Sequence, residues 1–382
     1  MSEIQKYDII IVGAGAAGLS LASSIAQTEM LSHLQVLLLD KSEKKGNDRT
    51  WCFWESGDGD YDDILTRSWP SVYFHSNSLS TKLDIDPYVY KMLRSSDFYN
   101  KTLSLITRSE NVTLVYDEVK SIDADTGKVD CANGSYISDM VFSSKLPIDI
   151  DYSKSLYTDQ HFGGWFVEFQ EDVFDSDTAT FMDFRIDQNN EHRFCYVLPL
   201  TGRKALVEVA IFSNDHQDQN GYDQILADYI SEYISESDYS IKEREYGVIP
   251  MTNYSFWDHN KGKLYHIGTA GGAVKPSSGY AFRRILQHTD RIIECLVSKG
   301  SISKSYDQFR GRHLLYDSTM LDVLEVQNIS GAKVFSDLFK NAKPDLILKF
   351  LDGDTTFIED IGIMKSVPIW PFIKGMSRVM LK

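Results

Sequence analysis

Three glycines near the start of the chain have the spacing of a phosphate-binding turn. Gly13, Gly15 and Gly18 form a GxGxxG pattern directly after the β-branched run Tyr7–Val12. In such a turn the first glycine permits a tight bend, the second lets the backbone approach a pyrophosphate, and the third lets the next helix pack on the strand. Free N–H groups at the N-terminus of that helix then attract the anion. We therefore predict a dinucleotide site, to which Ala17 also belongs.

A second apolar run, Leu34–Leu39, ends in Asp40. An acid at this place accepts hydrogen bonds from a ribose. Strand, turn, helix, strand and acid follow one another in the expected order, which disfavours a glycine-rich turn without a nucleotide. Arg49 either reaches the pyrophosphate or is a solvated surface cation.

The segment His266–Phe282 (HIGTAGGAVKPSSGYAF) is a second glycine-rich turn between a strand and a helix. It resembles the segment with which flavoproteins of the hydroxylase and reductase superfamily bind the flavin end of FAD, so FAD is favoured over NAD. Those proteins often have Asp where this chain has Thr269, whose hydroxyl can still bond the ribityl chain. The residues expected to contact the cofactor here are Gly268, Thr269, Gly271, Gly272 and Lys275.

Glu208 is the acid whose position best suits proton transfer. It interrupts the otherwise apolar strand Lys204–Phe212, where period-2 alternation puts it on one face with Leu206 and Ala210. A carboxyl in apolar surroundings has a raised pKa and keeps a transferable proton. The plain alternative is an outward-facing charge on a half-buried strand.

Several phrases in order along the chain resemble the bacterial lycopene β-cyclases. One departure is FSSKL at Phe142–Leu146, where an Asp-Ser/Ala-Arg-like strand end is expected. The phrases are NDRTWCFWE (Asn47–Glu55), HFGGWFVE (His161–Glu168), FMDFR (Phe181–Arg185), FCYVLPLTGRKALVEVAIF (Phe194–Phe212), YGVIPM (Tyr246–Met251), GTAGGAVKPSSGY (Gly268–Tyr280) and FLDGDTTFIEDIGIMKSVPIWPF (Phe350–Phe372).

The resemblance implies an isomerase of lycopene or a related linear carotene that needs reduced FAD, with NAD(P)H as the electron source. A terminal C=C is protonated, the cation closes a six-membered ring, and a ring proton is lost. Glu208 then serves in proton transfer, with removal of the ring proton as the favoured role and protonation of the alkene as the alternative. Asp183 is a second acid that stabilises the cation, positions the flavin or bonds a turn. The residues expected to line the polyene site, with core packing as the alternative, are Trp51, Phe53, Trp54, Trp165 and Tyr280.

The order of elements predicts an α/β fold: an FAD-binding Rossmann-like domain, an inserted, mostly antiparallel β substrate domain, and a C-terminal helical region. We expect a helix over residues 88–108. The expected division is 1–75 and 76–150 for the FAD-binding domain, 151–255 for the substrate domain, 256–305 for the return of the FAD-binding domain, and 306–382 for the C-terminal helices.

The net charge of −16 excludes broad contact with nucleic acid phosphates. The four cysteines form no CxxC pair, so neither a metal site nor a disulfide framework is expected, and a reducing cytosol fits. A signal peptide and a spanning helix are not expected.

The segment from Ile361 to the C-terminus has no acidic residue and mixes apolar side chains with Lys365, Lys374, Arg378 and Lys382. This composition suits an interfacial segment on the inner face of the cell membrane, or a helix that caps the core. Pro368 and Pro371 are expected to break any single long helix.

Two rival functions remain at the level of sequence. One is an FAD-dependent redox enzyme, such as a monooxygenase or an isoprenoid reductase. The other is a carotenoid-binding protein without catalysis, which has little use for FAD.

Overall fold

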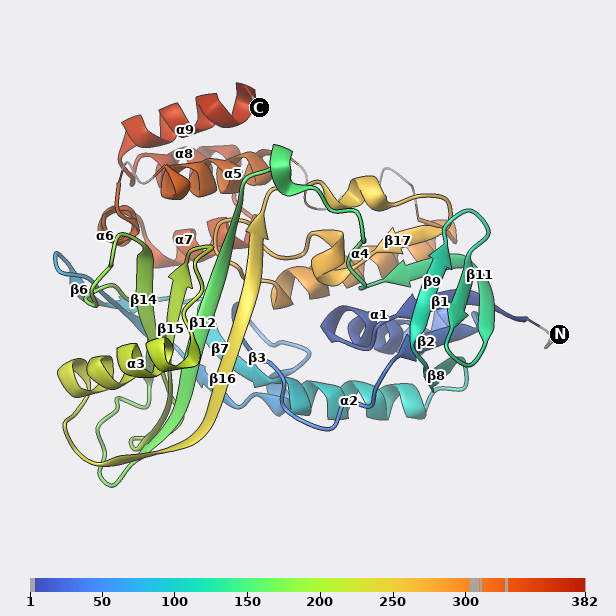
Figure 1. The fold of residues 1–382 in the computed structure, drawn as a ribbon, viewed down its shortest axis with the longest axis horizontal. Coiled ribbons are helices and arrows are strands. Elements are labelled where there is room, and N and C mark those ends of the chain that lie inside the picture. The colour runs from blue at the N-terminus through green and yellow to red at the C-terminus, as the bar shows by residue number, and fades with distance from the viewer. Residues whose placement is uncertain (1–3, 303–308, 310, 327–328, 382) are drawn as a thin grey trace.

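The structure is a computed structural model that describes residues 4–302, 309, 311–326 and 329–381, so that Lys382 lies outside the described residues. Figure 1 shows one lobe built around the N-terminal sheet and, beside it, a second lobe with the long strands of a larger β-sheet. The C-terminal helices lie together along one side of the second lobe (Figure 1). The α/β fold with an inserted, mostly antiparallel sheet and a helical C-terminal region is therefore confirmed.

The first sheet is mostly parallel, because β8, β2, β1, β11 and β17 all run in one direction. An antiparallel hairpin extends it beyond β11. Its strands, in order across the sheet, are β8 (Val112–Tyr116), β2 (Val36–Asp40), β1 (Gln5–Val12), β11 (Ser135–Ser143), β10 (Lys128–Cys131) and β9 (Val119–Asp123), with β17 (Leu264–His266) beside the end of β11.

Both faces of this sheet are covered. Ile9 and Ile11 of β1 pack against the layer of α1 (Ala16–Gln27), α2 (Ser95–Thr107) and α4 (Phe282–Lys299). Ile10 and Val12 belong to a core on the opposite face, with side chains from β9, β10 and β11. A strand buried on both faces needs a continuous run of apolar residues, which is the pattern of Tyr7–Val12.

The second sheet is antiparallel except where β13 meets β5. α3 (Gln219–Tyr233) covers one face, which we call the α3 face. The opposite face, the inner face, bears Tyr196, Leu206 and Ala210. The strands across the sheet are β16 (Tyr239–Thr252), β12 (Tyr157–Phe169), β15 (Lys204–Phe212), β14 (His192–Pro199), β13 (Thr178–Asp183), β5 (Ser71–His75) and β6 (Ser80–Asp84).

A small third sheet and the C-terminal helices enclose the inner face. The third sheet consists of β3 (Thr50–Ser56), β7 (Tyr88–Arg94) and β4 (Arg67–Trp69). Short 3-10 turns lie at Glu29–Leu31, Asp62–Ile64, Tyr152–Lys154, Phe256–His259 and Gly268–Gly271. The C-terminal helices are α5 (Arg312–Glu325), α6 (Gly331–Asn341), α7 (Pro344–Asp352), α8 (Phe357–Met364) and α9 (Ile369–Leu381).

The structure corrects three expectations about elements. The predicted helix over 88–108 begins only at Ser95, because residues 88–94 form β7 at the centre of the third sheet. β5 and β6, which fall in ranges expected for the FAD-binding domain, pair instead in the second sheet. Pro371 lies in the first turn of α9, where a missing N–H costs no hydrogen bond, so only Pro368 stands between helices.

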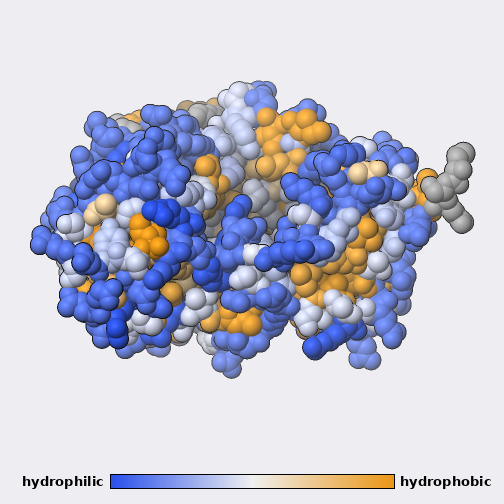
Figure 2. Space-filling view, turned by 60° about the horizontal axis from the view of Figure 1, so that its bottom comes forward, coloured by the Kyte–Doolittle hydropathy of each residue, from blue (hydrophilic) through white to orange (hydrophobic). Residues whose placement is uncertain are grey.

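Most of the face turned to the viewer in Figure 2 is hydrophilic, with apolar side chains gathered in separate patches. Within the described residues, no helix is long and apolar enough to cross a bilayer.

Candidate active site

The first glycine-rich turn has the close backbone packing that its sequence predicts. Gly13 has a φ of +99°, a conformation that favours glycine. A Cβ on Gly18 would lie 1.8 Å from the carbonyl oxygen of Gly13, so only glycine lets α1 start this close to β1. Ser144, from the divergent FSSKL segment, packs beside Gly13 and donates to the carbonyl of Val12 at 3.0 Å.

The N-terminus of α1 has the features of a phosphate site. Among the described residues no side chain caps it, and none lies within 4 Å of a Cβ built on its N-cap, Gly15. The second glycine-rich segment adjoins it, because a Cβ on Gly268 would lie 3.0 Å from the Cβ of Ala17. Free N–H groups beside open space, flanked by two glycine-rich turns, fit the pyrophosphate and ribityl chain of FAD.

Several other residues predicted to contact the cofactor also make interactions within the protein itself. Asp40 accepts from the backbone N–H of Ala14 at 2.6 Å and of Ser42 at 3.0 Å, so its carboxylate also braces the turn. Arg49 is exposed and donates to the carbonyl of Asp48 at 2.6 Å. In the second segment, Thr269 and Gly271 belong to the 3-10 turn Gly268–Gly271, and Gly272 ends it with a φ of +80°.

Lys275 is buried and is held away from solvent by an acid of α5. Its Nζ lies 2.7 Å from Asp317 Oδ1, and Ser277 donates to the same oxygen at 2.6 Å. Burial lowers the pKa of Lys275, against the opposing effect of Asp317. The lysine therefore ties the second glycine-rich segment to the C-terminal helices.

Glu208 lies on the inner face of the second sheet, as the period-2 pattern predicts. It is directly opposite Tyr196 on β14 and Gly164 on β12, and Gly164 is in turn opposite Glu245 on β16. Since Gly164 has no side chain, the two glutamates on either side of it can meet: a Cβ there would lie 3.3 Å from Glu208 Oε2. Thr50 on β3 donates to Glu245 Oε2 at 2.8 Å.

The surroundings of this pair favour a neutral acid. Burial raises the pKa of Glu208 well above its usual range, and the charge of Glu245 and a hydrogen bond with it add to the effect. Burial also raises the pKa of Glu245, although hydrogen bonds from Thr50 and Glu208 oppose this. One proton shared between two adjacent carboxyls is the expected state near neutral pH.

Aromatic side chains and a thiol surround the two carboxyls. The hydroxyls of Tyr90 and Tyr280 lie 3.3 Å apart, and burial raises the pKa of Tyr280. Burial also raises the pKa of the Cys52 thiol, with further contributions from Glu208 and Glu245. Phenols and a thiol that stay neutral, next to a protonated carboxyl, form a site of low polarity with one transferable proton.

A small cavity adjoins this group and brings together residues from two predicted sets. Cys52 lines it, and so do Phe53, Trp54, Lys275 and Tyr280, together with the charged residues Arg283, Arg284 and Asp352. The predicted flavin-end residue Lys275 is therefore close in space to Phe53 and Trp54, although these two predicted polyene contacts lie more than two hundred positions before it in the sequence.

The aromatic cluster of β3 is divided between two faces of the strand. Trp51 stacks on Phe282 of α4 with ring centroids 4.8 Å apart, and Phe53 packs on the same ring at 5.1 Å. Trp54 points the other way, edge-on to Tyr280 at 4.7 Å, and its indole donates to the carbonyl of Leu348 at 3.2 Å. Trp54 thus lies on the Glu208 side of the strand.

Asp183 and Trp165 lie on the α3 face, opposite Glu208. Asp183 is fully buried, pairs with Arg185 and accepts from Tyr229 at 2.8 Å; burial raises its pKa, but the Arg185 bonds outweigh this and hold it low. Trp165 donates to Asp223 of α3 at 2.9 Å. Neither is brought together with Glu208, and Asp183 bonds its own turn, the third of the roles expected for it.

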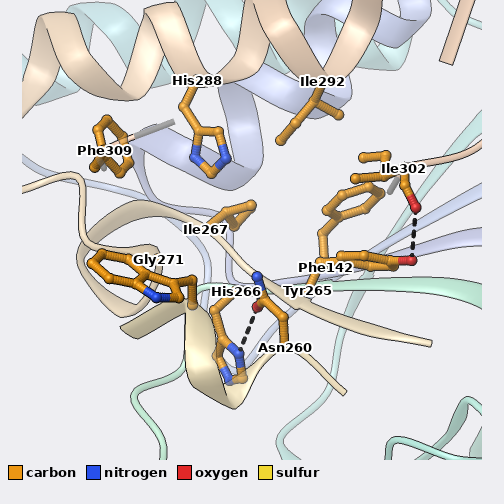
Figure 3. Close-up of a pocket in the computed structure, with 11 residues that line it drawn as sticks. Phe142, Asn260, Tyr265, His266, Ile267, Gly271, His288, Ile292, Ile302 and Phe309 are labelled. Carbon is orange, nitrogen blue, oxygen red and sulfur yellow. Dashed lines mark hydrogen bonds between the residues drawn. The ribbon is translucent and has the colours of Figure 1, made fainter. Parts of the chain in front are cut away.

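A further small cavity lies between β17, the 3-10 turn Gly268–Gly271 and α4 (Figure 3). Its two histidines, His266 and His288, have pKa values lowered to about 4 by burial and by nearby positive charge. Both are neutral at pH 7, so this cavity offers no acid for alkene protonation. Within the described residues, no group of His, Cys, Asp and Glu is arranged to bind a metal ion.

The sequence of β16 contains the partner acid that sequence reasoning missed. Glu243 and Glu245 alternate along the strand, the same period-2 pattern that identified Glu208. Their neighbours are polar, however, and nothing local marks Glu245 as facing a buried acid.

Comparison with known proteins decides the family. The model of the lycopene cyclase protein family matches residues 8–377, nearly the whole chain. The chain belongs to the lycopene cyclase family. A lycopene beta-cyclase from Pantoea ananas is 20% identical over 98% of both chains.

Solved structures similar to this lycopene cyclase family member show the same fold in flavoenzymes. A geranylgeranyl bacteriochlorophyll reductase-like protein from Thermoplasma acidophilum has a TM-score of 0.57 and 12% identity, covering 100% of this chain and 97% of its own. A p-nitrophenol 4-monooxygenase from Pseudomonas putida has a TM-score of 0.58 and 15% identity, covering 99% and 98%. At these identities the similarity establishes the fold alone, which is that of FAD-dependent enzymes.

Proposed function

We propose that the protein is a lycopene β-cyclase that converts the linear ends of lycopene to β-ionone rings, through γ-carotene to β-carotene. The observation that carries the proposal is a pair of adjoining carboxyls, Glu208 and Glu245, on the inner face of the second sheet, beside a cavity lined by aromatic side chains at the flavin end of an FAD-type fold. Membership of the lycopene cyclase family supports it.

The site offers what cyclisation requires. A carboxylic acid out of contact with bulk water is a strong enough donor to protonate an alkene when the cation formed is stabilised. The rings of Trp54, Tyr196 and Tyr280 surround the carboxyl and present π-electrons to such a cation. The same apolar walls exclude water that would otherwise trap the cation as an alcohol.

FAD would be held by the first glycine-rich turn and α1 at its pyrophosphate, by Asp40 near its ribose, and by residues 268–275 at its flavin end. When bound in its reduced form, it supplies an electron-rich ring that stabilises positive charge without net redox change. We further propose NAD(P)H as the source of its electrons.

The second candidate is an FAD-dependent redox enzyme, because the solved structures with this fold include a monooxygenase and a reductase-like protein. The two functions differ in stoichiometry. A redox enzyme consumes one NAD(P)H for each product molecule, whereas a cyclase needs reductant only to prime its flavin.

The direct test is expression in a host that accumulates lycopene, followed by pigment analysis. We expect β-carotene from the wild type, and unchanged lycopene with retained FAD from Glu208→Gln, since the amide keeps the shape but has no acidic proton; the loss should be at least about 10²-fold. Glu168→Gln is the matched control, because this half-buried acid lies at the end of β12 and bonds Lys204 and Lys242. Unchanged lycopene from well-folded, FAD-loaded wild type would refute the proposal.

We also propose that the protein takes its substrate from the inner face of the cell membrane through α8 and α9. α9 packs on α5 through Gly375, where a Cβ would lie 3.0 Å from Val323. Arg378 pairs with Asp322, and within the part of the chain that the structure describes no ion pair holds Lys365 or Lys374. The outward side chains are apolar, with Ile358 81%, Trp370 73% and Leu381 88% exposed. Such a surface suits insertion into the interface of a bilayer.

A further inference from the structure

The carboxyl pair on the inner face of the second sheet supports an inference about Glu245, which rests on the proposed cyclase function. We propose that Glu208 and Glu245 share one proton, and that Glu245 is the positioning residue that keeps Glu208 in the acid form.

The geometry requires the two carboxyls to interact. Both project from the same row of paired residues, on either side of Gly164, where no side chain separates them. Two carboxylates that adjoin each other across a glycine in a buried site repel each other too strongly for both to be ionised. One proton held between them removes the repulsion and makes a hydrogen bond.

Hydrogen-bond donors decide which carboxyl carries the charge. Thr50 donates to Glu245, and a donor stabilises the ionised form of its acceptor. Glu208 faces the rings of Tyr196 and Tyr280 instead. The proton therefore rests on Glu208 and the charge on Glu245.

The other titratable groups around the pair do not alter this assignment. Among the cations, Arg94 of β7 is held by both oxygens of Glu243 at 2.6 Å, and Lys275 and Arg283, which line the adjoining cavity with Arg284, pair with Asp317 and Glu55. Cys52 of β3 is a neutral thiol, because burial raises its pKa. The phenols Tyr90, Tyr196 and Tyr280 likewise stay neutral, since burial raises the pKa of each.

The reaction then balances within the pair. The O–H bond of Glu208 breaks as a C–H bond forms at the less substituted carbon of the terminal C=C, which leaves a tertiary cation at the other carbon. The electron pair of the neighbouring double bond forms the ring C–C bond, and loss of a ring proton leaves its electron pair as the ring C=C. That proton goes to a carboxylate of the pair, which ends with one proton, as it began. Between the two transfers both carboxylates are ionised, and the positive charge of the substrate cation offsets their repulsion.

The first test is the pH dependence of cyclisation by purified, FAD-loaded, reduced protein supplied with lycopene in vesicles. Activity of the wild type should fall as pH rises through the raised pKa of Glu208. In Glu245→Gln the negative neighbour is gone, so Glu208 ionises at lower pH; the fall should move to lower pH, and activity at neutral pH should drop about 10²-fold. Glu245→Asp should restore the wild-type profile in part, and Glu168→Gln should leave it unmoved.

The second test does not need activity. Infrared spectroscopy distinguishes the C=O stretch of a carboxylic acid from that of a carboxylate. The wild type should show an acid band that Glu208→Gln removes and that Glu245→Gln loses at lower pH. Asp352, whose pKa burial raises to about 7, should contribute a band that both variants retain.

The outcomes separate this inference from the proposed function. If the infrared acid band shows these shifts but lycopene is not cyclised, the shared proton is supported and the proposed cyclase function is refuted. Cyclisation whose pH profile is the same in wild type and Glu245→Gln, with FAD content and thermal unfolding unchanged, overturns the shared proton.

Discussion

Gly164 is the residue on which the carboxyl pair depends. With any side chain at this position, Glu208 and Glu245 would be separated by it, because all three share one row of the inner face. The second glycine of the HFGGWFVE phrase therefore has a role in the site, while the first, Gly163, lies against Tyr222 of α3.

Gly164→Ala tests this role. The new methyl group would lie 3.1 Å from Leu206 Cδ1 and 3.3 Å from Glu208 Oε2, so the carboxyl must move aside. Because small displacements of a reacting group are costly, we expect cyclisation to fall by about 10-fold or more, with FAD content unchanged. Gly134→Ala is the control, since its nearest neighbour would be 3.9 Å away; equal activity of both variants would contradict the role.

Sequence alone could identify Glu208 but not its partner. The alternation of Leu206, Glu208 and Ala210 gives the face of the acid, and this is local information. The meeting with Glu245 depends on the register of β12 against β15 and β16, which no local pattern encodes. The family resemblance predicts Asp183 as a second acid that stabilises the cation, positions the flavin or bonds a turn, and the pairing of β13 with β14 places it on the α3 face beside Arg185.

At the scale of elements, the βαβ unit is the part that sequence describes best. Its turn, helix and strands follow from glycine spacing and continuous apolar runs. The predicted helix over residues 88–94 is wrong because the structure there depends on distant segments and not on a local pattern. β7 is a strand because β3 and β4 pair with it on either side, and both partners lie elsewhere in the chain.

Gly18→Ala tests the βα turn. A Cβ placed 1.8 Å from the carbonyl of Gly13 must push α1 away from β1, and backbone cannot yield as a side-chain tip does. We expect loss of bound FAD and destabilisation by about 1–3 kcal/mol. Flavin absorbance per protein after gel filtration and urea unfolding measure the two effects. Gly46→Ala, whose methyl group would meet open space, should change neither the FAD content nor the free energy of unfolding. A Gly18→Ala variant that retains its FAD would contradict this account of the turn.

At the scale of the whole molecule, the C-terminal helices are the surface through which this acidic protein would take up the proposed apolar substrate. The net charge of −16 opposes adsorption to anionic lipid over most of the surface. The exposed apolar side chains of α8 and α9 provide a local exception, so binding there should depend on insertion more than on charge.

Vesicle co-sedimentation tests this surface. Trp370→Ser combined with Leu381→Ser removes two of its most exposed side chains and should reduce the vesicle-bound fraction about 10-fold or more, while cyclisation of detergent-dispersed lycopene persists. The control is Ile148→Ser, which removes an isoleucine that is 90% exposed outside these helices. If the control weakens binding as much as the double variant, the surface is misassigned.

The late position of β17 in the chain has a consequence for synthesis on the ribosome. β17 completes the edge of the first sheet beside β11, yet five of the seven strands of the second sheet, β12 to β16, are translated between the two strands. The nascent chain must therefore keep the end of β11 unpaired, and β5 without its partner β13, until distant segments emerge. Neither lobe is a continuous stretch of chain, so a stalled or truncated product exposes open strand edges, and chaperone demand should peak before residue 266 leaves the exit tunnel.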